Sequence, residues 1–359
     1  MSRALSCLAL LAPLVCGCGA AAPSSHTACA GDALGPPGPS LLSRTRIVAP
    51  TTVTPLSPEA AAALKPRSAV VFTAGGLIYR GASAGLVVEE LAEDGTIREL
   101  ATLYLTSAAN DVVIDGGFAY VALGPTGVAV VDVSSPFAPK ARAIIDTPGG
   151  AFRLSLADKL LAVGDGTAGV VLVDVSNPQR PIPRAAWQST GYVRHVVQRG
   201  GVLYAAEDGE GVAVLRLGPG DDLRLVTRVR TDGKARALAL EGTRLYVADG
   251  PKGLAVLDAT DAQAPRVIGR LELADMARDV VASGDRAFVA NGDHGLAVID
   301  VSSPSAPRLA ASLPADKPVN RLHLDGNRLY MANDAAGMLV VDVTTPDRPA
   351  QIHPAPTRK

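Results

Sequence analysis

Apolar residues between about residue 68 and residue 353 occur in short runs, and each run ends at a turn-forming residue such as glycine, proline or aspartate. Runs of this kind are typical of strands that are buried on both faces. In one representative unit the predicted strands are Asp111–Ile114, Phe118–Leu123, Val128–Asp132 and Lys140–Ile145. No helical period of comparable length competes with them. The pattern therefore predicts an all-β domain built from units of four short strands.

The pattern repeats with a fixed period. Seven glycines, here called the ruler glycines, follow one another at intervals of 42 residues (127 − 85 = 42): Gly85, Gly127, Gly169, Gly211, Gly253, Gly295 and Gly337. A unit of about 40 to 50 residues is the length of one four-stranded propeller blade. We predict an all-β fold, a seven-bladed β-propeller of 42-residue four-stranded repeats over residues 68–353.

Two further positions of the repeat carry turn signals. Eleven residues before the ruler glycine, five units have a second glycine, which predicts a two-residue hairpin with positive φ: Gly116, Gly200, Gly242, Gly284 and Gly326. Five residues after the ruler glycine, five units have an aspartate: Asp132, Asp174, Asp258, Asp300 and Asp342. We predict that these carboxylates cap the following turn by accepting its backbone N–H groups, with catalysis as the alternative.

The first residues predict export. A short basic start is followed by the apolar run Ala4–Val15, which is too short to span a bilayer as a permanent helix. The segment Leu14–Cys18 resembles the lipobox of bacterial lipoproteins, which implies a signal peptide over residues 1–17 and lipid attachment at Cys18. Gly19, which is not acidic, suggests the outer membrane by analogy with the sorting rule of enteric bacteria. We expect an exported protein, lipid-anchored to the bacterial envelope, with an ordinary secretory signal as the alternative.

The remaining segments are short. Residues 18–43 are rich in Ala, Pro, Ser and Gly and predict a flexible tether. Residues 44–67 form an N-terminal extension with a predicted helix over Ser57–Pro66, and residues 354–359 form a C-terminal tail. Because Pro354 cuts short the last outer strand, we expect Arg46–Val48 to add a strand to the final blade.

Composition excludes several classes of function. The formal net charge is −1, so there is no basic excess for nucleic acid. Of the four cysteines, only Cys29 remains free in the mature chain, which leaves neither a disulfide framework nor a structural zinc site. No metal site or cofactor motif is visible. The loops Asp165–Gly169 and Asn291–Gly295 could hold calcium, but they lack closely spaced oxygen ligands.

Polar residues gather at one predicted face. In a propeller, the starts of the first strands and the loops between the second and third strands surround one mouth of the channel. The candidate binding rim is Arg153, Asp165, Arg194, His195, Glu207, Arg236, Asp249, Arg278, Asn291, Arg321 and Asn333, with Asp279 beside it.

These rim residues face one another across hairpins. We therefore predict the ion pairs Arg194–Glu207 and Arg236–Asp249, and a hydrogen bond between Arg278 and Asn291. Either these pairs only satisfy one another, or the guanidiniums bind the carboxylate or phosphate of a small anionic ligand or the loop of a partner.

Two of the units resemble a known repeat. Tyr246–Asp258 and Phe288–Pro304 are similar to the LVIVD-repeat family of bacterial exported propellers. The resemblance implies the propeller fold and an extracytoplasmic setting, but no chemistry. The first unit (Val87–Leu91) and the fourth unit (Leu215–Asp222) depart from the pattern.

The sequence favours a binding or protein-interaction module, a monomeric propeller that acts through its polar channel mouth. The alternative is a hydrolase or lyase with its active site at the same mouth. The five histidines are scattered, and no nucleophile with an adjacent base is visible, so no catalytic residue is assigned. The partner is an unknown envelope protein or a small anionic ligand.

Overall fold

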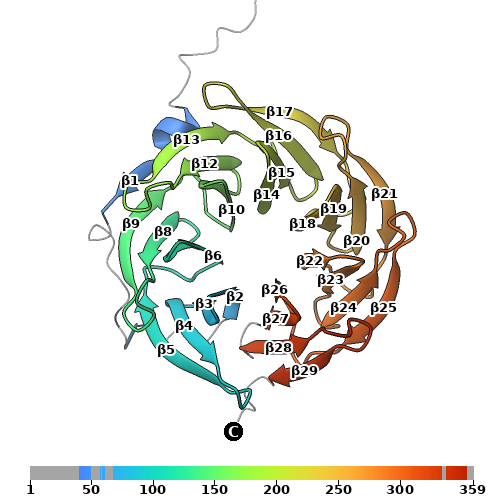
Figure 1. Ribbon diagram of the computed structural model, residues 1–359. Helices are drawn as coiled ribbons and strands as arrows, with labels where there is room; N and C mark the ends of the chain where they lie inside the picture. The colour runs from blue at the N-terminus through green and yellow to red at the C-terminus, as the bar shows by residue number, and fades with distance from the viewer. Residues whose placement is uncertain (1–39, 50–56, 58, 61–67, 334–336, 354–359) are drawn as a thin grey trace, which may run out of the picture. The chain divides into compact units, whose positions relative to one another are not determined.

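The computed structural model describes residues 40–49, 57, 59–60, 68–333 and 337–353. Seven antiparallel sheets are arranged in a ring around a common axis (Figure 1), and each contains four strands that are consecutive in sequence. The predicted seven-bladed β-propeller is confirmed. None of the helices in these ranges is long and apolar enough to cross a membrane. The predicted signal peptide, Cys18, most of the tether and the C-terminal tail lie outside the described residues.

The first three blades contain strands β2 to β13. Blade one consists of β2 (Ser68–Ala74), β3 (Leu77–Ala82), β4 (Gly85–Leu91) and β5 (Ile97–Tyr104). Blade two consists of β6 (Asp111–Asp115), β7 (Phe118–Ala122), β8 (Val128–Asp132) and β9 (Lys140–Asp146). Blade three consists of β10 (Arg153–Ala157), β11 (Leu160–Gly164), β12 (Val170–Asp174) and β13 (Ile182–Trp187).

The other four blades follow the same order. Blade four consists of β14 (His195–Arg199), β15 (Val202–Ala206), β16 (Val212–Gly218) and β17 (Asp222–Val229). Blade five consists of β18 (Ala237–Glu241), β19 (Arg244–Ala248), β20 (Leu254–Asp258) and β21 (Arg266–Leu271). Blade six consists of β22 (Asp279–Ser283), β23 (Arg286–Ala290), β24 (Leu296–Asp300) and β25 (Arg308–Leu313). Blade seven consists of β26 (Arg321–Asp325), β27 (Arg328–Ala332), β28 (Met338–Asp342) and β29 (Ala350–His353).

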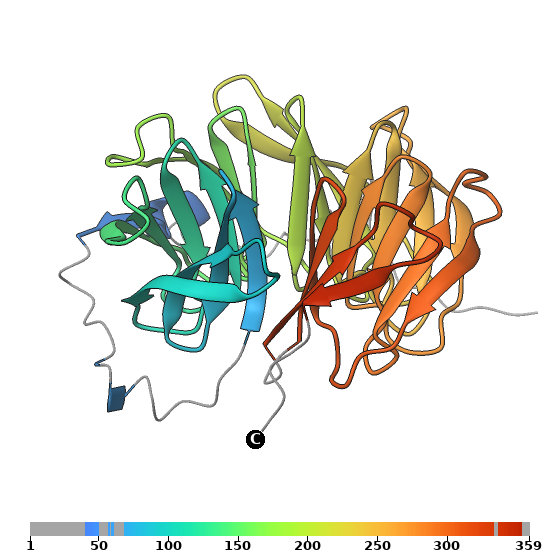
Figure 2. The ribbon, with the colours of Figure 1, turned by 60° about the horizontal axis from the view of Figure 1, so that its bottom comes forward.

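The strands of each blade run between the two faces of the ring (Figure 2). Hairpins between the first and second strands therefore lie on one face, called the hairpin face. Loops between the second and third strands lie on the other, called the mouth face. The first strands β2, β6, β10, β14, β18, β22 and β26 contact one another in a closed cycle around the channel.

The predicted turn caps are present. Asp132 Oδ1 accepts the backbone N–H of Ser134 at 3.1 Å, and hydrogen bonds from Ser134 and Arg142 lower the pKa of Asp132 to about 2. The same backbone contact, to the residue two positions on, is made by Asp174, Asp258, Asp300 and Asp342. Each of these carboxylates therefore caps the turn of its own repeat, as predicted.

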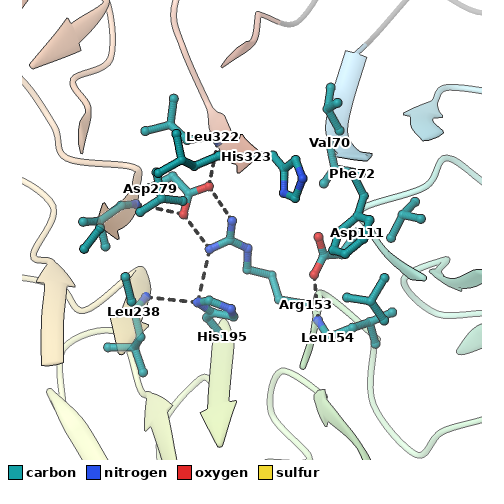
Figure 3. Close-up of a pocket in the computed structure, with 18 of the residues that line it drawn as sticks. Val70, Phe72, Asp111, Arg153, Leu154, His195, Leu238, Asp279, Leu322 and His323 are labelled. Carbon is teal, nitrogen blue, oxygen red and sulfur yellow. Dashed lines mark hydrogen bonds and ion pairs between the residues drawn. The ribbon is translucent and has the colours of Figure 1, made fainter. Parts of the chain in front are cut away.

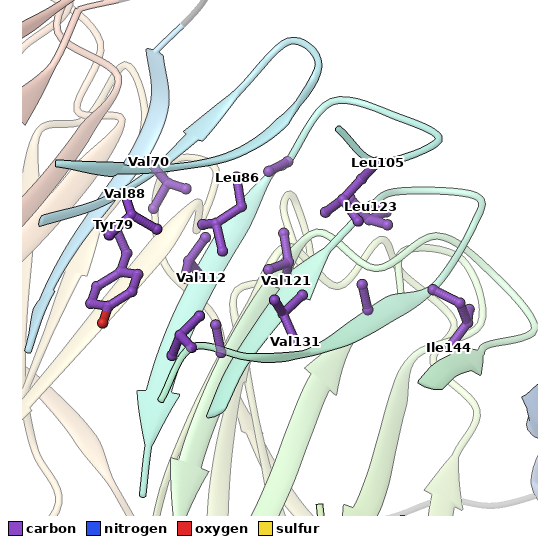
Figure 4. Packing of buried hydrophobic residues seen from close by; sticks show 14 residues of the cluster. Val70, Tyr79, Leu86, Val88, Leu105, Val112, Val121, Leu123, Val131 and Ile144 are labelled. Carbon is purple, nitrogen blue, oxygen red and sulfur yellow. The ribbon is translucent and has the colours of Figure 1, made fainter. Parts of the chain in front are cut away.

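Apolar side chains fill the spaces between blades. Between blades one and two, Val70, Leu86 and Val88 meet Val112 and Val121, all of them buried (Figure 4). The other six interfaces hold equivalent clusters. Strands buried on both faces therefore need apolar residues on both, which explains the near-continuous runs in the sequence.

The ring closes by side-chain packing between blades seven and one. His323 Nε2 accepts the Thr73 N–H at 3.1 Å, and the Thr73 hydroxyl donates to Asp325 at 2.8 Å. The rings of Phe72 and His323 are also in contact, with centroids 4.7 Å apart. Burial lowers the pKa of His323 to about 4, so this histidine is a neutral acceptor at physiological pH.

The expectation that Arg46–Val48 would complete the final blade is wrong. This segment, β1 (Arg46–Val48), instead pairs antiparallel with β9, with Ile47 opposite Ile145, and makes blade two five-stranded. Blade seven completes its own sheet, because β29 pairs with β28 despite its short length. The segment thus covers the open outer edge of another blade, which protects that edge from pairing with other chains.

Two short segments precede the ring. The helix α1 (Leu41–Arg44) contacts β13, so the last residues of the predicted tether are helical. Most of the helix predicted over residues 57–66 lies outside the described residues. Within them, Ser57 Oγ accepts the N–H of Ala60 at 3.1 Å, as an N-cap does.

Candidate functional site

Arginines gather at the mouth face of the channel. A cavity of about 250 Å³ opens there, and seven residues line it: Asn110, Phe152, Arg194, Arg236, Arg278, Asn320 and Arg321. All but Arg321 occupy one position of the repeat, seventeen residues before the ruler glycine, immediately ahead of a first strand. The lining thus contains four guanidiniums and no carboxylate.

The four guanidiniums differ in their partners. Arg194 donates to Asp208 Oδ2 at 2.9 Å, and Arg278 Nη1 donates to Asn320 Oδ1 at 2.5 Å. Arg236 and Arg321 have no side-chain hydrogen bond or ion pair to any residue that the structure describes, and the buried Nε of Arg236 is unsatisfied. Burial lowers the pKa of Arg236, and the nearby Arg194 adds to this effect. The mouth therefore holds two guanidiniums that form no ion pair or side-chain hydrogen bond with the described part of the chain.

The predicted pairs across the hairpins are wrong. Glu207 accepts from Arg228 at 2.8 Å and from Ser189, so it does not pair with Arg194. Asp249 does not contact Arg236, and Asn291 does not contact Arg278. The backbone positions oppose one another as expected, but the acidic side chains turn to the loop that arrives from the preceding blade.

These acidic side chains clamp the connections between blades. Asp165 accepts the Thr147 hydroxyl at 2.6 Å and the Gly149 N–H at 2.9 Å. Asp249 makes the same two contacts, with Thr231 and Gly233. The residues at the same position of three other repeats bind the equivalent loops: Glu207, Asn291 and Asn333. None of the five lines the mouth cavity, so this part of the predicted rim serves the fold.

The buried clamp at Asp165 predicts a pH effect. Burial raises the pKa of Asp165 to about 6 from 3.8, although its hydrogen bonds oppose the shift. Between these values the folded chain binds more protons than the unfolded chain, so stability falls as pH rises. In Asp165→Asn this contribution is absent, and Asn291 shows that the position accepts an amide.

The measurement is urea unfolding of both proteins between pH 4 and pH 7. The free energy of unfolding of the wild type, relative to that of Asp165→Asn, is expected to fall by about 2–3 kcal/mol across this range. A difference that is constant with pH would show that folding does not shift the pKa of Asp165.

One residue deeper, the channel is crossed by a polar belt. It lies sixteen residues before the ruler glycine. It comprises Asp111, Arg153, His195 and Asp279, which Figure 3 labels, and also Arg321. Arg153 of blade three reaches Asp279 of blade six, with Nη1–Oδ1 and Nη2–Oδ2 distances of 2.8 and 2.5 Å. Both side chains are buried, at 6% and 1% exposure. A bidentate ion pair between Arg153 and Asp279 thus crosses the channel and joins blades that are distant in sequence.

Belt side chains also form hydrogen bonds to the backbone of the next blade, in every second blade. Asp111 of blade two accepts the N–H of Leu154 in blade three at 2.7 Å. His195 of blade four accepts the N–H of Leu238 in blade five at 3.0 Å, and Asp279 of blade six accepts that of Leu322 in blade seven at 3.0 Å. The acceptor side chains thus lie in blades two, four and six, and the N–H donors lie in blades three, five and seven.

His195 is not free to act as a general base in the belt. His195 Nδ1 accepts from Leu238 and lies 3.2 Å from Arg153 Nη1, so its lone pair is already used. Burial and the charge of Arg153 lower the pKa of His195 well below its usual value. Among the residues that the structure describes, no group of three side chains is placed to hold a metal ion.

The belt separates two cavities. Below it, toward the hairpin face, a space of about 500 Å³ is lined by Asp111, Arg153, His195 and Asp279, and by first-strand residues such as Val113 and Val281. The two cavities share no lining residue. Of the predicted rim, Arg194, Arg236 and Arg278 therefore line the mouth, and Arg153 and His195 belong to the belt. Arg321 belongs to the belt and also lines the mouth cavity.

Sequence reasoning missed Asp208, the partner of Arg194. Its position, three residues before the ruler glycine, has positive φ and is glycine in four other repeats: Gly124, Gly166, Gly250 and Gly292. Asp208 has φ of 51°, and this backbone directs its carboxylate to Arg194. The recurrent glycine indicates a backbone with positive φ, and a side chain on such a backbone points in a different direction from the side chains of a strand.

Comparison with known proteins agrees with this architecture. Four segments match the LVIVD repeat: residues 107–147, 148–183, 232–272 and 274–313. The chain carries LVIVD repeats. The matches fall on blades two, three, five and six of this LVIVD-repeat propeller, and the divergent first and fourth units lie outside them. No curated protein sequence matches the chain.

Solved structures resemble the LVIVD-repeat propeller in fold. The computationally designed Ika8 protein is 12% identical, with a TM-score of 0.58, and the match covers 77% of this chain and 96% of that chain. A chain in the crystal structure of the Mitotic Checkpoint Complex is 16% identical, with a TM-score of 0.64 and coverage of 86% and 97%. At these identities the likeness extends to the fold alone.

Proposed function

We infer that this LVIVD-repeat propeller is a binding module that holds an anionic group at its channel mouth. The observation that carries the inference is Arg236, a partly buried arginine without an acceptor among the described residues, between Arg194 and Arg278. Guanidiniums bind carboxylate and phosphate through paired N–H donors, so an anion would satisfy several donors at once.

Electrostatics support this assignment. Arg194, Arg236 and Arg278 come from consecutive blades and converge on one cavity. Arg321 lies at its base, and burial together with the charge of Arg153 lowers the pKa of Arg321 to about 10. Like charges that are close and partly shielded from water destabilise one another, and a bound anion removes this cost. The ligand is either a small anion or an acidic loop of a partner.

The proposal includes the cellular setting expected from the sequence. The chain would be exported, anchored through lipid on Cys18 and held as a monomer at the bacterial envelope, in the outer membrane. The ligand of the mouth face would be a small anion or an envelope protein. Within the described residues, the belt geometry gives no support to a hydrolase or lyase, because the His195 lone pair is occupied.

The anion site is tested by Arg236→Gln. Inorganic phosphate is titrated into the wild-type protein at low ionic strength by calorimetry, and the variant is expected to bind about tenfold more weakly, because a charged donor pair is lost. Arg266→Gln is the matched control. It removes an arginine of the same blade whose side chain is 76% exposed and outside the cavity, and its phosphate affinity should equal that of the wild type.

Equal phosphate affinity in wild type and Arg236→Gln would contradict the assignment of Arg236. Absence of phosphate binding to the wild type, with acetate equally inert, would contradict the anion site as a whole.

A further inference from the structure

The mouth cavity has an aromatic side. At the repeat position that holds arginine or asparagine in five other blades, blade three has Phe152, and this ring lines the cavity. Phe152 packs on Tyr192, with ring centroids 5.2 Å apart and planes inclined at 58°. The Arg194 guanidinium lies 5.0 Å from the centre of the Tyr192 ring. Phe152, Tyr192 and Arg194 thus form a continuous row, here called the aromatic shelf.

The row is held in place from both ends. Arg194 is fixed by its ion pair with Asp208, and its cation–π contact positions the Tyr192 ring. Phe152 is partly buried and donates its backbone N–H to Gly164 at 2.9 Å. The contacts of the Tyr192 ring with Phe152 and Arg194 reduce the ordering of side chains that binding against the shelf requires.

Charge and apolar surface occupy different arcs of the mouth. The guanidiniums of Arg194, Arg236 and Arg278 come from blades four, five and six, whereas blades two and three contribute the uncharged Asn110 and Phe152. A symmetric inorganic anion would use only the cationic arc. A ligand with an anionic group at one end and a planar ring at the other would use both.

We propose that the mouth binds a small aromatic anion, a carboxylate or phosphate attached to one planar ring. The anionic group lies among Arg194, Arg236 and Arg278, and the ring lies against Phe152 by offset or edge-to-face contact. The cavity of about 250 Å³ limits the ligand to a single ring system, since pockets that hold drug-sized ligands have volumes of about 300–1,000 Å³. This inference rests on the proposed anion site and specifies its ligand class.

The test compares phenyl phosphate with inorganic phosphate by calorimetry on the full chain. Phenyl phosphate is expected to bind about tenfold more tightly to the wild type, because the ring adds aromatic contact and apolar burial. In Phe152→Ala the ratio of the phenyl phosphate affinity to the phosphate affinity should fall to about one, whatever the change in phosphate affinity itself. Phe152→Leu, which keeps an apolar side chain at the position, should retain part of it.

Phe137→Ala is the control variant. Phe137 lies between β8 and β9 and is 70% exposed, so both affinities should match the wild type. Benzoate is titrated in parallel, and its affinity relative to phenyl phosphate assigns the anionic group as carboxylate or phosphate.

The outcomes separate the two proposals. Equal affinity for phosphate and phenyl phosphate would overturn the aromatic inference and leave the anion site standing. Equal weakening of both ligands in Phe152→Ala would also overturn it, because Phe152 would then act only by shaping the mouth. Failure of the wild type to bind any of the three anions would overturn both proposals.

Discussion

Asp279→Ala is expected to lower the free energy of unfolding by about 3–5 kcal/mol. The buried carboxylate accepts two hydrogen bonds from Arg153 and one each from the N–H groups of Leu322 and Val280. Its removal leaves the Arg153 guanidinium without its counter-ion inside the channel and two backbone donors without an acceptor. Urea unfolding followed by the fluorescence of Trp187, the single tryptophan, measures the loss.

Asp115→Ala is the control, because it removes an ion pair with Lys159 whose lysine side chain is 53% exposed. Its expected loss is below about 1 kcal/mol. The double variant Arg153→Met, Asp279→Ala should be more stable than Asp279→Ala, since no uncompensated charge remains. If Asp279→Ala loses no more unfolding free energy than Asp115→Ala, the ion pair between Arg153 and Asp279 does not stabilise the fold.

The second large effect is expected from a ruler glycine. Gly169 has φ of 94°, and a Cβ at this position would lie 2.1 Å from the carbonyl oxygen of Trp187 and 2.6 Å from the N–H nitrogen of Ser189. Both neighbours are backbone atoms, which cannot move without displacing the outer strand of the blade. Gly169→Ala should therefore lose at least about 3 kcal/mol, the sum of left-handed strain and overpacking.

Gly200→Ala separates the two causes. Gly200 has φ of 56°, and a Cβ there would meet nothing within 4 Å, so only the left-handed strain of about 1–2 kcal/mol applies. The same urea titration compares the two variants. Equal losses would mean that the close approach of the outer strand at Gly169 is relieved without cost.

Much of the candidate site followed from the periodicity. Aligning the repeats on the ruler glycine placed Arg194, Arg236 and Arg278 at one position, and topology puts equal positions of consecutive blades side by side. The same alignment assigned the turn caps such as Asp132, because a cap acts within a few residues of its own position.

Contacts between blades could not be read in the same way. Glu207 was expected to meet Arg194 across a hairpin, but it binds Ser189 of the incoming loop and Arg228 of the outer strand. The belt pair Arg153 and Asp279 is separated by 126 residues in sequence. Side-chain direction at these positions depends on the connection between blades, which carries no periodic signal of its own.

The sequence by itself determined the number of blades, the strands of each and the position that forms the mouth, because these depend on local turns and on a strict 42-residue period. Only the tertiary structure decided which arginines keep a partner, that Phe152 and Tyr192 form a shelf beside them, and that β1 joins blade two. The physical reason is ring closure. It brings the side chains at seven equivalent positions into one small space, where side chains of different charge and shape interact.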